Sequence, residues 1–573
     1  MTTERRLNGP QTTGRDYRNL SRPQFTTRSD DNTHVPMRDG VTLLADVHRP
    51  HADGRYPALI AASPYPRQMQ DFGAPAGFIE AGATDFWVSR GYVHVIANVR
   101  GTGGSGGTFA FFDPQERQDM HDLVEWAAAQ PWCDGNVGMI GISYFAMTQL
   151  EAAVERPPHL KAIFPVAVTA DLYDAASHHG LASTSFITPF LSMMGLTSDR
   201  SDGFWRRNPA IATARRILNT PPLHRKFATM NGEAAVTMMR ALLKLPHSPH
   251  PWDDLWLDTV VKHPLRDDWW EARNLLPLLE NIDIPVYLGC DWENVPLHLP
   301  STFTAWEALA DNPNVRMALL GRFGLTWPWE SLHHEALAWY DHWLKGHDTG
   351  IMDGPPIRYV LPGTDGWHTA DQWPPAATTL TEFALRADGR LDIAEGEPGG
   401  REYLTLGAGL NRAKASRIDP PSLLSWTTAP LTETIDVVGG IELRLVASAT
   451  ASDTAWMATL ERIAADGTTS EVTAGWLRAS LREVDEVASR AGAPVLACRT
   501  FAPVPIGVDV EYRIPLVANA RRFAAGDRIR LTLTSDDQDP KAPAIMNFRH
   551  ASVGTSSLNT VRSSSRLVLS VRA

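Results

Sequence analysis

Short apolar runs alternate with helical stretches in the first third of the chain. Three of the runs are bounded by glycine or proline and predict buried strands: YPALIAAS (56–63), GYVHVIANV (91–99) and VGMI (137–140). Between the last two, residues 113–130 repeat their apolar side chains at helical spacing. Strands that alternate with helices in this way predict a parallel sheet with helices on both faces.

The pattern changes between about residues 172 and 279. This stretch is rich in Pro, Trp, Met and His, and its apolar residues fall at helical spacing over 232–245, with no clear strands. This pattern predicts a helical insertion into the α/β core, and such an insertion forms a cap over a functional site. The α/β pattern then resumes with predicted strands at 284–289 and 315–321, followed by an amphipathic helix over 330–346.

The last part of the chain alternates apolar with polar residues, as half-buried antiparallel strands do. Three segments show it clearly: 440–448, 527–535 and 565–571. Turn residues recur at short intervals, which predicts a β-sandwich of the jelly-roll kind. The predicted organisation is a polar leader (1–30), an α/β core (31–171 and 280–352), a helical cap (172–279) and a C-terminal β-sandwich (353–573).

Composition narrows the class of protein. A net charge of −12 argues against a nucleic-acid partner, since phosphate neutralisation requires clustered Lys and Arg. The N-terminal residues carry no apolar signal segment, and no window reaches the length of a membrane-spanning helix. The cysteines are Cys133, Cys290 and Cys498, widely spaced and odd in number, so neither a disulfide framework nor a structural zinc site is expected. These features predict a cytoplasmic protein.

Motifs for cofactors are absent from the sequence. There is no P-loop, no G-x-G-x-x-G between strand and helix, and no H-E-x-x-H. The segment GTGGSGG (101–107) is glycine-rich but lacks the lysine that a phosphate site requires. We therefore expect no cofactor and no metal.

The strongest candidate for chemistry is Ser143. The segment Gly141-Ile142-Ser143-Tyr144-Phe145-Ala146 follows a predicted strand and precedes a predicted helix. This is where an α/β-hydrolase presents its nucleophile, usually in the pattern G-x-S-x-G. The second glycine is missing here, and on spacing alone Ser143 could equally be a helix N-cap after a strand.

Five segments together resemble the cocaine esterase and X-Pro dipeptidyl-peptidase-like (CocE/NonD) hydrolases: VPMRDGVTLLADVHRP (35–50), SPYPR (63–67), VRGTGGSGG (99–107), DLVEWAAAQPWCDGNVGMIGISYFAMTQLEAA (122–153) and PPHLKAI (157–163). The likeness continues through WYDHWLKGHDTG (339–350) and AGDRIRLTLTSDD (525–537). Those enzymes carry a G-x-S-Y-x-G elbow, so Tyr144 matches and Ala146 replaces a glycine. The resemblance implies an α/β-hydrolase core with an inserted helical cap and a C-terminal jelly-roll β-sandwich.

The resemblance also implies roles for further residues. The backbone N–H of Tyr144 and the hydroxyl of Tyr65, in SPYPR, would form the oxyanion hole. The family pattern G-G-W-Y-D, laid on residues 289–293, puts the triad acid at Glu293, with Asp291 as the alternative. The alternative for Tyr65 is a buried ring with a hydrogen-bonded hydroxyl. The alternative for Glu293 and Asp291 is that they are solvated loop carboxylates.

The expected general base is missing. The family places its histidine in a G-P-W-x-H segment, whereas this chain has Leu320-Gly321-Arg322-Phe323-Gly324-Leu325. His333 is the nearest candidate, although its helical stripe is typical of packed residues. The other candidates are His334 beside it, His178 and His179 at the entrance to the cap, and His298 shortly after Glu293. Arg322 would add a cation near the pocket, or would pair with Glu330 at the surface.

The sequence therefore favours a serine hydrolase that cleaves a carboxylic ester or amide through an acyl-enzyme on Ser143. The resemblance implies substrates that range from acyl esters through amino acid esters to X-Pro peptides. The alternatives are a catalytically degenerate member that binds a ligand or partner, and a non-hydrolytic acyl-transfer enzyme. The expected partner is a small-molecule ester or amide, with neither nucleic acid nor membrane, and a homodimer is allowed.

Overall fold

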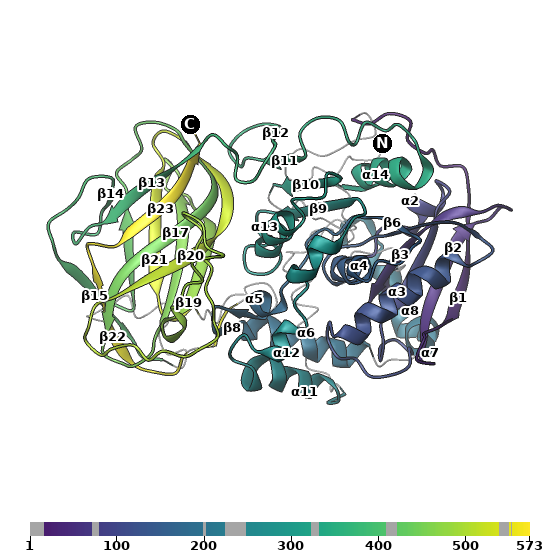
Figure 1. Ribbon diagram of the computed structural model, residues 1–573, viewed down its shortest axis with the longest axis horizontal. Helices are drawn as coiled ribbons and strands as arrows, with labels where there is room; N and C mark the ends of the chain where they lie inside the picture. Colours follow the sequence, from purple (N-terminus) through teal and green to yellow (C-terminus); the bar gives the residue numbers. More distant parts are fainter. Residues whose placement is uncertain are drawn as a thin grey trace.

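A computed structural model describes residues 16–70, 79–198, 202–223, 248–321, 332–407, 421–537, 549–551 and 553–572. The hydrolase domain lies beside a β-rich domain, and the cap helices lie along one end of the hydrolase domain, next to the junction (Figure 1). Within these ranges, no helix has both the length and the apolar character needed to cross a bilayer.

The hydrolase domain is built on one sheet. Its strands are β1 (Thr27–Pro36), β2 (Thr42–Pro50), β3 (Tyr56–Ser63), β4 (Val93–Asn98), β5 (Cys133–Met139), β6 (Leu160–Ile163), β9 (Val286–Asp291), β10 (Val315–Leu320), β11 (Ile357–Val360) and β12 (Trp367–Ala370). Their order is β1-β2-β4-β3-β5-β6-β9-β10-β11-β12. Neighbours from β4 to β11 pair in parallel, whereas β1, β2 and β12 pair antiparallel at the edges. Every residue of β4 is buried, as expected for a strand covered on both faces.

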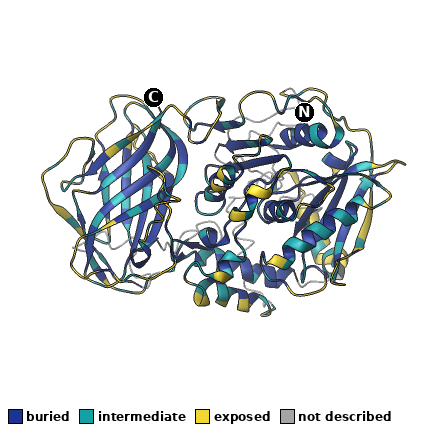
Figure 2. Ribbon diagram, viewed as in Figure 1, coloured by how far each residue is buried: buried dark blue, intermediate teal, exposed yellow. Residues whose placement is uncertain are grey.

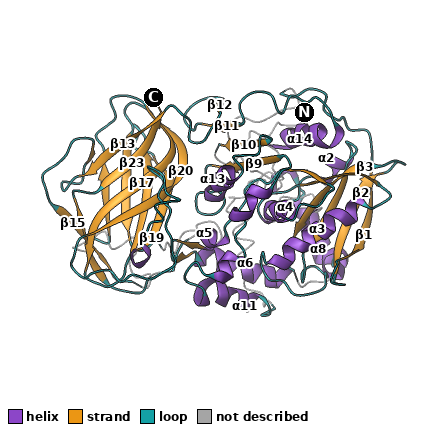
Figure 3. Ribbon diagram, in the orientation of Figure 1, coloured by secondary structure: helices purple, strands orange, loops and turns teal. Residues whose placement is uncertain are grey.

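Helices cover both faces of this sheet (Figure 3). They are α1 (Arg67–Gln70), α2 (Thr84–Val88), α3 (Pro114–Ala128), α4 (Tyr144–Val154), α13 (Leu299–Ala308) and α14 (His333–Lys345). Helix α3 begins where the Asp113 side chain accepts a hydrogen bond from the Glu116 N–H at 2.9 Å and where Pro114 takes the first helical position. Helix α14 packs on the sheet and donates a hydrogen bond from Trp339 Nε1 to the Ile163 carbonyl at 3.1 Å.

The cap is mostly helical. Its elements are α5 (Leu172–Ala176), β7 (Ser177–His178), β8 (Leu181–Ala182), α6 (Thr184–Thr197), α7 (Asp202–Arg207), α8 (Pro209–Leu218), α11 (Trp252–Leu257), the π-helix η1 (Asp258–Lys262), α12 (Asp268–Glu271) and the 3₁₀-helix η2 (Leu276–Asn281). The short hairpin β7–β8 corrects the expectation of helices alone, and it turns through positive φ at His179 and Gly180. The predicted helix over 232–245 lies outside the described residues.

The C-terminal domain is an antiparallel β-sandwich. Its elements are β13 (Thr378–Leu385), β14 (Leu391–Asp392), β15 (Gly400–Thr405), β16 (Leu423–Thr427), β17 (Ile435–Ala449), β18 (Ala455–Ile463), β19 (Thr469–Arg478), the 3₁₀-helix η5 (Ala479–Leu481), β20 (Val510–Phe523), β21 (Arg528–Thr534), β22 (Ser557–Arg562) and β23 (Arg566–Arg572). In β21, buried residues alternate with more exposed ones, as the sequence pattern predicted. The buried faces meet in the interior (Figure 2).

Two predicted boundaries need correction. Strands β11 and β12 fall within the predicted sandwich range, yet β11 pairs with β10 and extends the hydrolase sheet beyond residue 353. Short edge strands such as these carry too little pattern to assign them to one sheet or the other. The predicted leader is also shorter than 1–30, because β1 begins at Thr27 and Ser21 donates hydrogen bonds to Asp341 of α14.

Candidate active site

Ser143 lies in a sharp turn between β5 and α4. Its backbone has φ 58° and ψ −122°, a combination that serine rarely adopts and that costs about 1–3 kcal/mol. Its N–H donates to the Val166 carbonyl at 3.1 Å, and its carbonyl accepts from the Ala146 N–H at 2.8 Å. At Gly141, with φ 125°, a Cβ would lie 2.4 Å from the Phe145 Cβ. The turn therefore requires the first glycine of the elbow, while the buried Ala146 methyl group fits at the second position.

Tyr65 follows β3 and reaches the same point. It is buried, and its hydroxyl shares a hydrogen bond with the Ser143 side chain. Its ring meets the rings of Tyr144 and Phe145 edge-on, with centroids 6.1 Å and 5.8 Å away. Burial, and then the nearby Glu80 carboxylate, raise the pKa of Tyr65 well above 10, against the hydrogen bond with Ser143. The hydroxyl therefore stays protonated and can donate.

Tyr144 begins α4 and is fixed at both ends of its side chain. Its ring stacks on Phe112 with centroids 4.2 Å apart, and its hydroxyl donates to Glu116 Oε1 of α3 at 2.8 Å. Burial raises the pKa of Glu116 to about 8, so this carboxyl is mostly protonated at neutral pH. Glu151 of α4 is also buried, and burial together with the Glu116 charge raises its pKa well above the usual range.

Glu80 is the third buried carboxyl near the elbow. Its backbone carbonyl accepts the Ile142 N–H at 3.2 Å, and burial raises the pKa of its side chain to about 8. Among the described residues, its Oε2 atom has no hydrogen-bond partner. The sequence pattern did not indicate Glu116, and for Glu80 the available signal was a glutamate between the apolar residues Ile79 and Ala81. The three buried carboxyls described near the elbow, Glu80, Glu116 and Glu151, are therefore mostly protonated at neutral pH.

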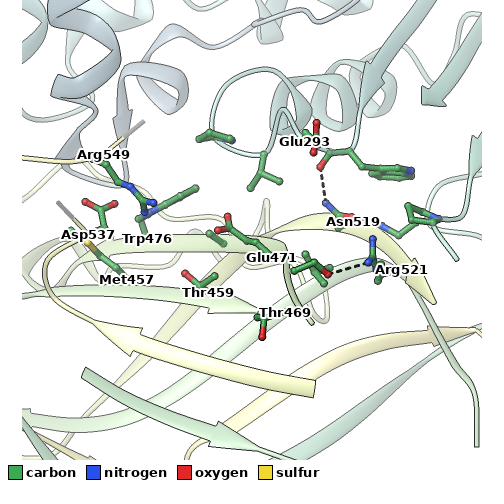
Figure 4. A pocket seen from close by; sticks show the side chains of 18 of the residues that line it. Glu293, Met457, Thr459, Thr469, Glu471, Trp476, Asn519, Arg521, Asp537 and Arg549 are labelled. Carbon is green, nitrogen blue, oxygen red and sulfur yellow. Dashed lines mark hydrogen bonds between the residues drawn. The ribbon is translucent and has the colours of Figure 1, made fainter. Parts of the chain in front are cut away.

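The two candidate acids differ in their surroundings. Asp291, the last residue of β9, is buried, and its Oδ1 accepts hydrogen bonds from the Glu293 N–H, the Asn294 N–H and the Asn294 side chain at 2.8–3.2 Å. Glu293 is half-buried and lines a cavity between the hydrolase domain and the sandwich (Figure 4). Asp291 thus lies at the carboxyl edge of the sheet, the edge that also carries Ser143.

The candidate histidines lie in other contacts. The His333 ring stacks on Phe86 of α2 at a centroid distance of 4.7 Å, and His334 meets the same ring edge-on at 5.7 Å. His298 Nδ1 is 3.0 Å from Thr169 Oγ1, and burial lowers the pKa of His298 to about 3.

The other two candidate histidines contact the sandwich: His178 stacks on Trp476, and His179 Nδ1 lies 2.9 Å from the Trp476 carbonyl. In the part of the chain that the structure describes, no histidine is hydrogen-bonded to Ser143. Arg322 and Glu330 lie outside that part.

The arrangement supplies a serine in an elbow, a protonated tyrosine hydroxyl that interacts with the Ser143 side chain, and the N–H of Tyr144 at the first position of α4. Donors placed beside a serine in this way stabilise the oxyanion that forms when a hydroxyl attacks a carbonyl carbon. The site therefore suits acyl transfer from an ester or amide.

Comparisons with known proteins agree with this geometry. A sequence model of the X-Pro dipeptidyl-peptidase (S15 family) matches residues 39–324, and one of the X-Pro dipeptidyl-peptidase C-terminal non-catalytic domain matches residues 349–544. The cocaine esterase of Rhodococcus sp. (strain MB1 Bresler) is 29% identical over 554 residues, which cover 88% of this chain and 90% of the esterase.

Solved structures share the whole fold. A CocE/NonD family hydrolase from Staphylococcus aureus superposes with a TM-score of 0.74 at 21% identity, over 95% of this chain and 93% of that one. An α-amino acid ester hydrolase superposes with a TM-score of 0.71 at 17% identity, over 100% of both chains. The chain belongs to the CocE/NonD, X-Pro dipeptidyl-peptidase-like family of serine hydrolases.

Proposed function

We propose that this protein hydrolyses a carboxylic ester or amide through an acyl-enzyme on Ser143. The observation that carries the proposal is the elbow itself, where Ser143 is held at positive φ with its hydroxyl hydrogen-bonded to Tyr65. Strained backbone of this kind persists only where the surrounding structure enforces it, and it concentrates at functional sites.

In the proposed reaction, the Ser143 oxygen attacks the carbonyl carbon of the substrate and its hydroxyl proton passes to a base. The carbonyl oxygen becomes an oxyanion, which accepts hydrogen bonds from the Tyr65 hydroxyl and the Tyr144 N–H. Collapse of the intermediate expels the alcohol or amine, which takes up a proton. Water then attacks the acyl-enzyme, releases the carboxylic acid and restores the serine hydroxyl.

We expect this hydrolysis to be slow. With no histidine hydrogen-bonded to Ser143 in the described residues, the oxyanion donors and substrate binding carry the acceleration. In serine hydrolases these alone leave about 10³ to 10⁴-fold catalysis over water. His333 as base and Glu293 as acid stay predictions, and burial at the carboxyl edge of the sheet favours Asp291 over Glu293 as the carboxylate nearest the reaction.

Esters are the substrate class to test first. The cocaine esterase relative matches most of this chain, and an ester carbonyl is more reactive than an amide, so it places the smaller demand on a site with a weak base. Short-chain p-nitrophenyl esters report acyl-enzyme formation directly, because their leaving group absorbs visible light.

The test is covalent labelling of the purified protein with a fluorophosphonate probe, with Ser143→Ala as the control. Stoichiometric labelling on the peptide that contains Ser143, lost in the Ala variant, supports the proposal. A folded protein that neither takes the label nor turns over p-nitrophenyl esters overturns it. That second outcome would favour a member of the family that binds a ligand without hydrolysing it, a reading that the occupied histidines also favour.

A further inference from the structure

A cavity of about 550 Å³ lies between the hydrolase domain and the sandwich (Figure 4). The loop after β9 forms one wall, and strands β18, β19, β20 and β21 form the other. Its lining includes Glu293, the predicted acid, but neither Ser143 nor the tyrosines beside it, so the cavity is separate from the elbow. Small-molecule sites in proteins typically occupy about 300–1,000 Å³, so the size suits a small ligand.

Two oppositely charged side chains face this cavity. Arg549 and Glu471 point into it from different elements, Glu471 from β19 (Figure 4). Among the residues that the structure describes, neither side chain makes a hydrogen bond or an ion pair, and the Arg549 Nε atom is buried. The Arg549 charge acts on Glu471, yet burial among protein atoms still raises the pKa of the Glu471 carboxyl. Glu471 is exposed to solvent and Arg549 is half-buried, so a ligand in the cavity can reach both side chains.

The other charged groups of the cavity are already engaged. Asp537 accepts a hydrogen bond from the His550 N–H at 3.0 Å and contacts His550 Nδ1 at 2.7 Å. Burial opposes its ionisation, but the His550 charge and these bonds lower the pKa of Asp537 overall. Arg521 donates to Ser470 at 3.1 Å. Glu293, which also lines the cavity, is not free either. Arg549 and Glu471 therefore remain as the groups available to a ligand.

The wall beside Asp537 is held by one hydrogen-bonded chain. His550 Nε2 lies 2.5 Å from His178 Nδ1, and His178 Nε2 lies 2.5 Å from the Pro296 carbonyl. Burial keeps the pKa of His178 well below the usual range, so this imidazole is neutral and carries one proton. The Pro296 carbonyl can only accept a hydrogen bond, so the His178 proton is on Nε2 and His178 Nδ1 accepts. His550 Nε2 then donates to His178 Nδ1, and His550 Nδ1 lies against Asp537 Oδ2. These contacts engage the Asp537 carboxylate and hold the wall in place.

We propose that the cavity binds a small zwitterion of the amino acid or dipeptide type, whose carboxylate pairs with Arg549 and whose ammonium group pairs with Glu471. A simple anion would leave Glu471 unpaired, and a simple cation would leave Arg549 unpaired. A guanidinium binds a carboxylate through two parallel hydrogen bonds, which gives this end of the site its geometry. The hydroxyls of Thr459 and Thr469 line the same space and can bind peptide groups.

The first arm of the test uses three probes on the unmodified protein, measured by isothermal titration calorimetry. Glycylglycine carries both charges, N-acetylglycylglycine lacks the ammonium group, and glycylglycinamide lacks the carboxylate. The proposal expects saturable binding of glycylglycine, with each blocked analogue weaker by at least about tenfold. This arm needs no variant, so misfolding cannot explain its result.

The second arm uses substitutions. Arg549→Met and Glu471→Gln should each weaken glycylglycine binding by at least about tenfold. The matched controls Arg562→Met and Glu402→Gln, which lie on β22 and β15 outside the cavity lining, should leave it unchanged. Ser143→Ala should also bind normally, because the site does not depend on the proposed hydrolysis. Absence of saturable glycylglycine binding, equal binding of the blocked analogues, or unaltered binding by both cavity variants would overturn the proposal.

Discussion

Replacement of Glu80 by glutamine tests whether a neutral carboxyl lies beside the elbow. Glu80 is buried, and burial raises its pKa from 4.5 to about 8. In the unfolded chain the same carboxyl ionises near its ordinary pKa. Between these two values the folded protein therefore holds a proton that the unfolded chain has lost. The free energy of unfolding then falls as the pH rises from about 4.5 to about 8 and is constant above that range.

The size of the effect follows from the two pKa values. A difference of about 3.5 pKa units, at about 1.36 kcal/mol per unit, corresponds to about 5 kcal/mol of stability lost at alkaline pH. Glutamine keeps the shape and cannot ionise, so Glu80→Gln removes this loss. Relative to the wild type, the variant should gain about 4 kcal/mol of stability between about pH 5 and about pH 9.

The assay is urea unfolding followed by tryptophan fluorescence at both pH values. Trp87 lies in α2, close after Glu80 in the chain, and provides a buried reporter. The exposed Glu397 serves as a matched control, and Glu397→Gln should follow the wild type at both pH values. The reasoning fails if the difference in urea midpoint between Glu80→Gln and the wild type is the same at acid and at alkaline pH. That result would mean that the Glu80 carboxyl is not buried in its neutral form.

Three further variants probe the elbow. Tyr65→Phe should lower kcat for p-nitrophenyl esters by about 10² to 10³-fold through loss of one oxyanion donor, and an unchanged kcat would rule out that role. Glu116→Ala should cost about 1–3 kcal/mol in urea unfolding because the Tyr144 hydroxyl loses its acceptor, while Glu116→Gln retains most of the stability; equal losses would contradict the hydrogen bond. Gly141→Ala should lower the melting temperature sharply, since its Cβ meets Phe145, and a normal melting temperature would refute the tight turn.

Much of the hydrolase core could be predicted from the sequence. The strand at 56–63 and the helix over 113–130 match β3 and α3 closely, because long runs of one periodicity fix both the type and the extent of an element. The elbow at Ser143 could be predicted for a different reason. Gly141, a glycine that the strained turn requires, precedes Ser143 by two residues, and both lie between a predicted strand and a predicted helix.

The surroundings of the elbow could not be predicted in the same way. Glu116 occurs in a helix that carries many polar residues, and Glu151 is a single carboxylate in the mostly apolar α4, so neither reads as part of a buried cluster until α3 and α4 pack together. The position of Glu293 depends on which face of the loop after β9 meets the sandwich, and sequence spacing does not encode that contact. Burial of a charged group is set by elements far apart in the chain, whereas periodicity records only local order.

The chain from Asp537 through His550 and His178 to the Pro296 carbonyl has a consequence for how the protein can be divided. Each of the three domains contributes at least one group to it. Removal of the sandwich would take away His550, the partner of His178 Nδ1, and the Trp476 ring on which His178 stacks, and would leave this buried histidine at a newly opened surface. The sandwich is thus no detachable module, and a gene fragment that ends after the hydrolase sheet encodes an incomplete enzyme.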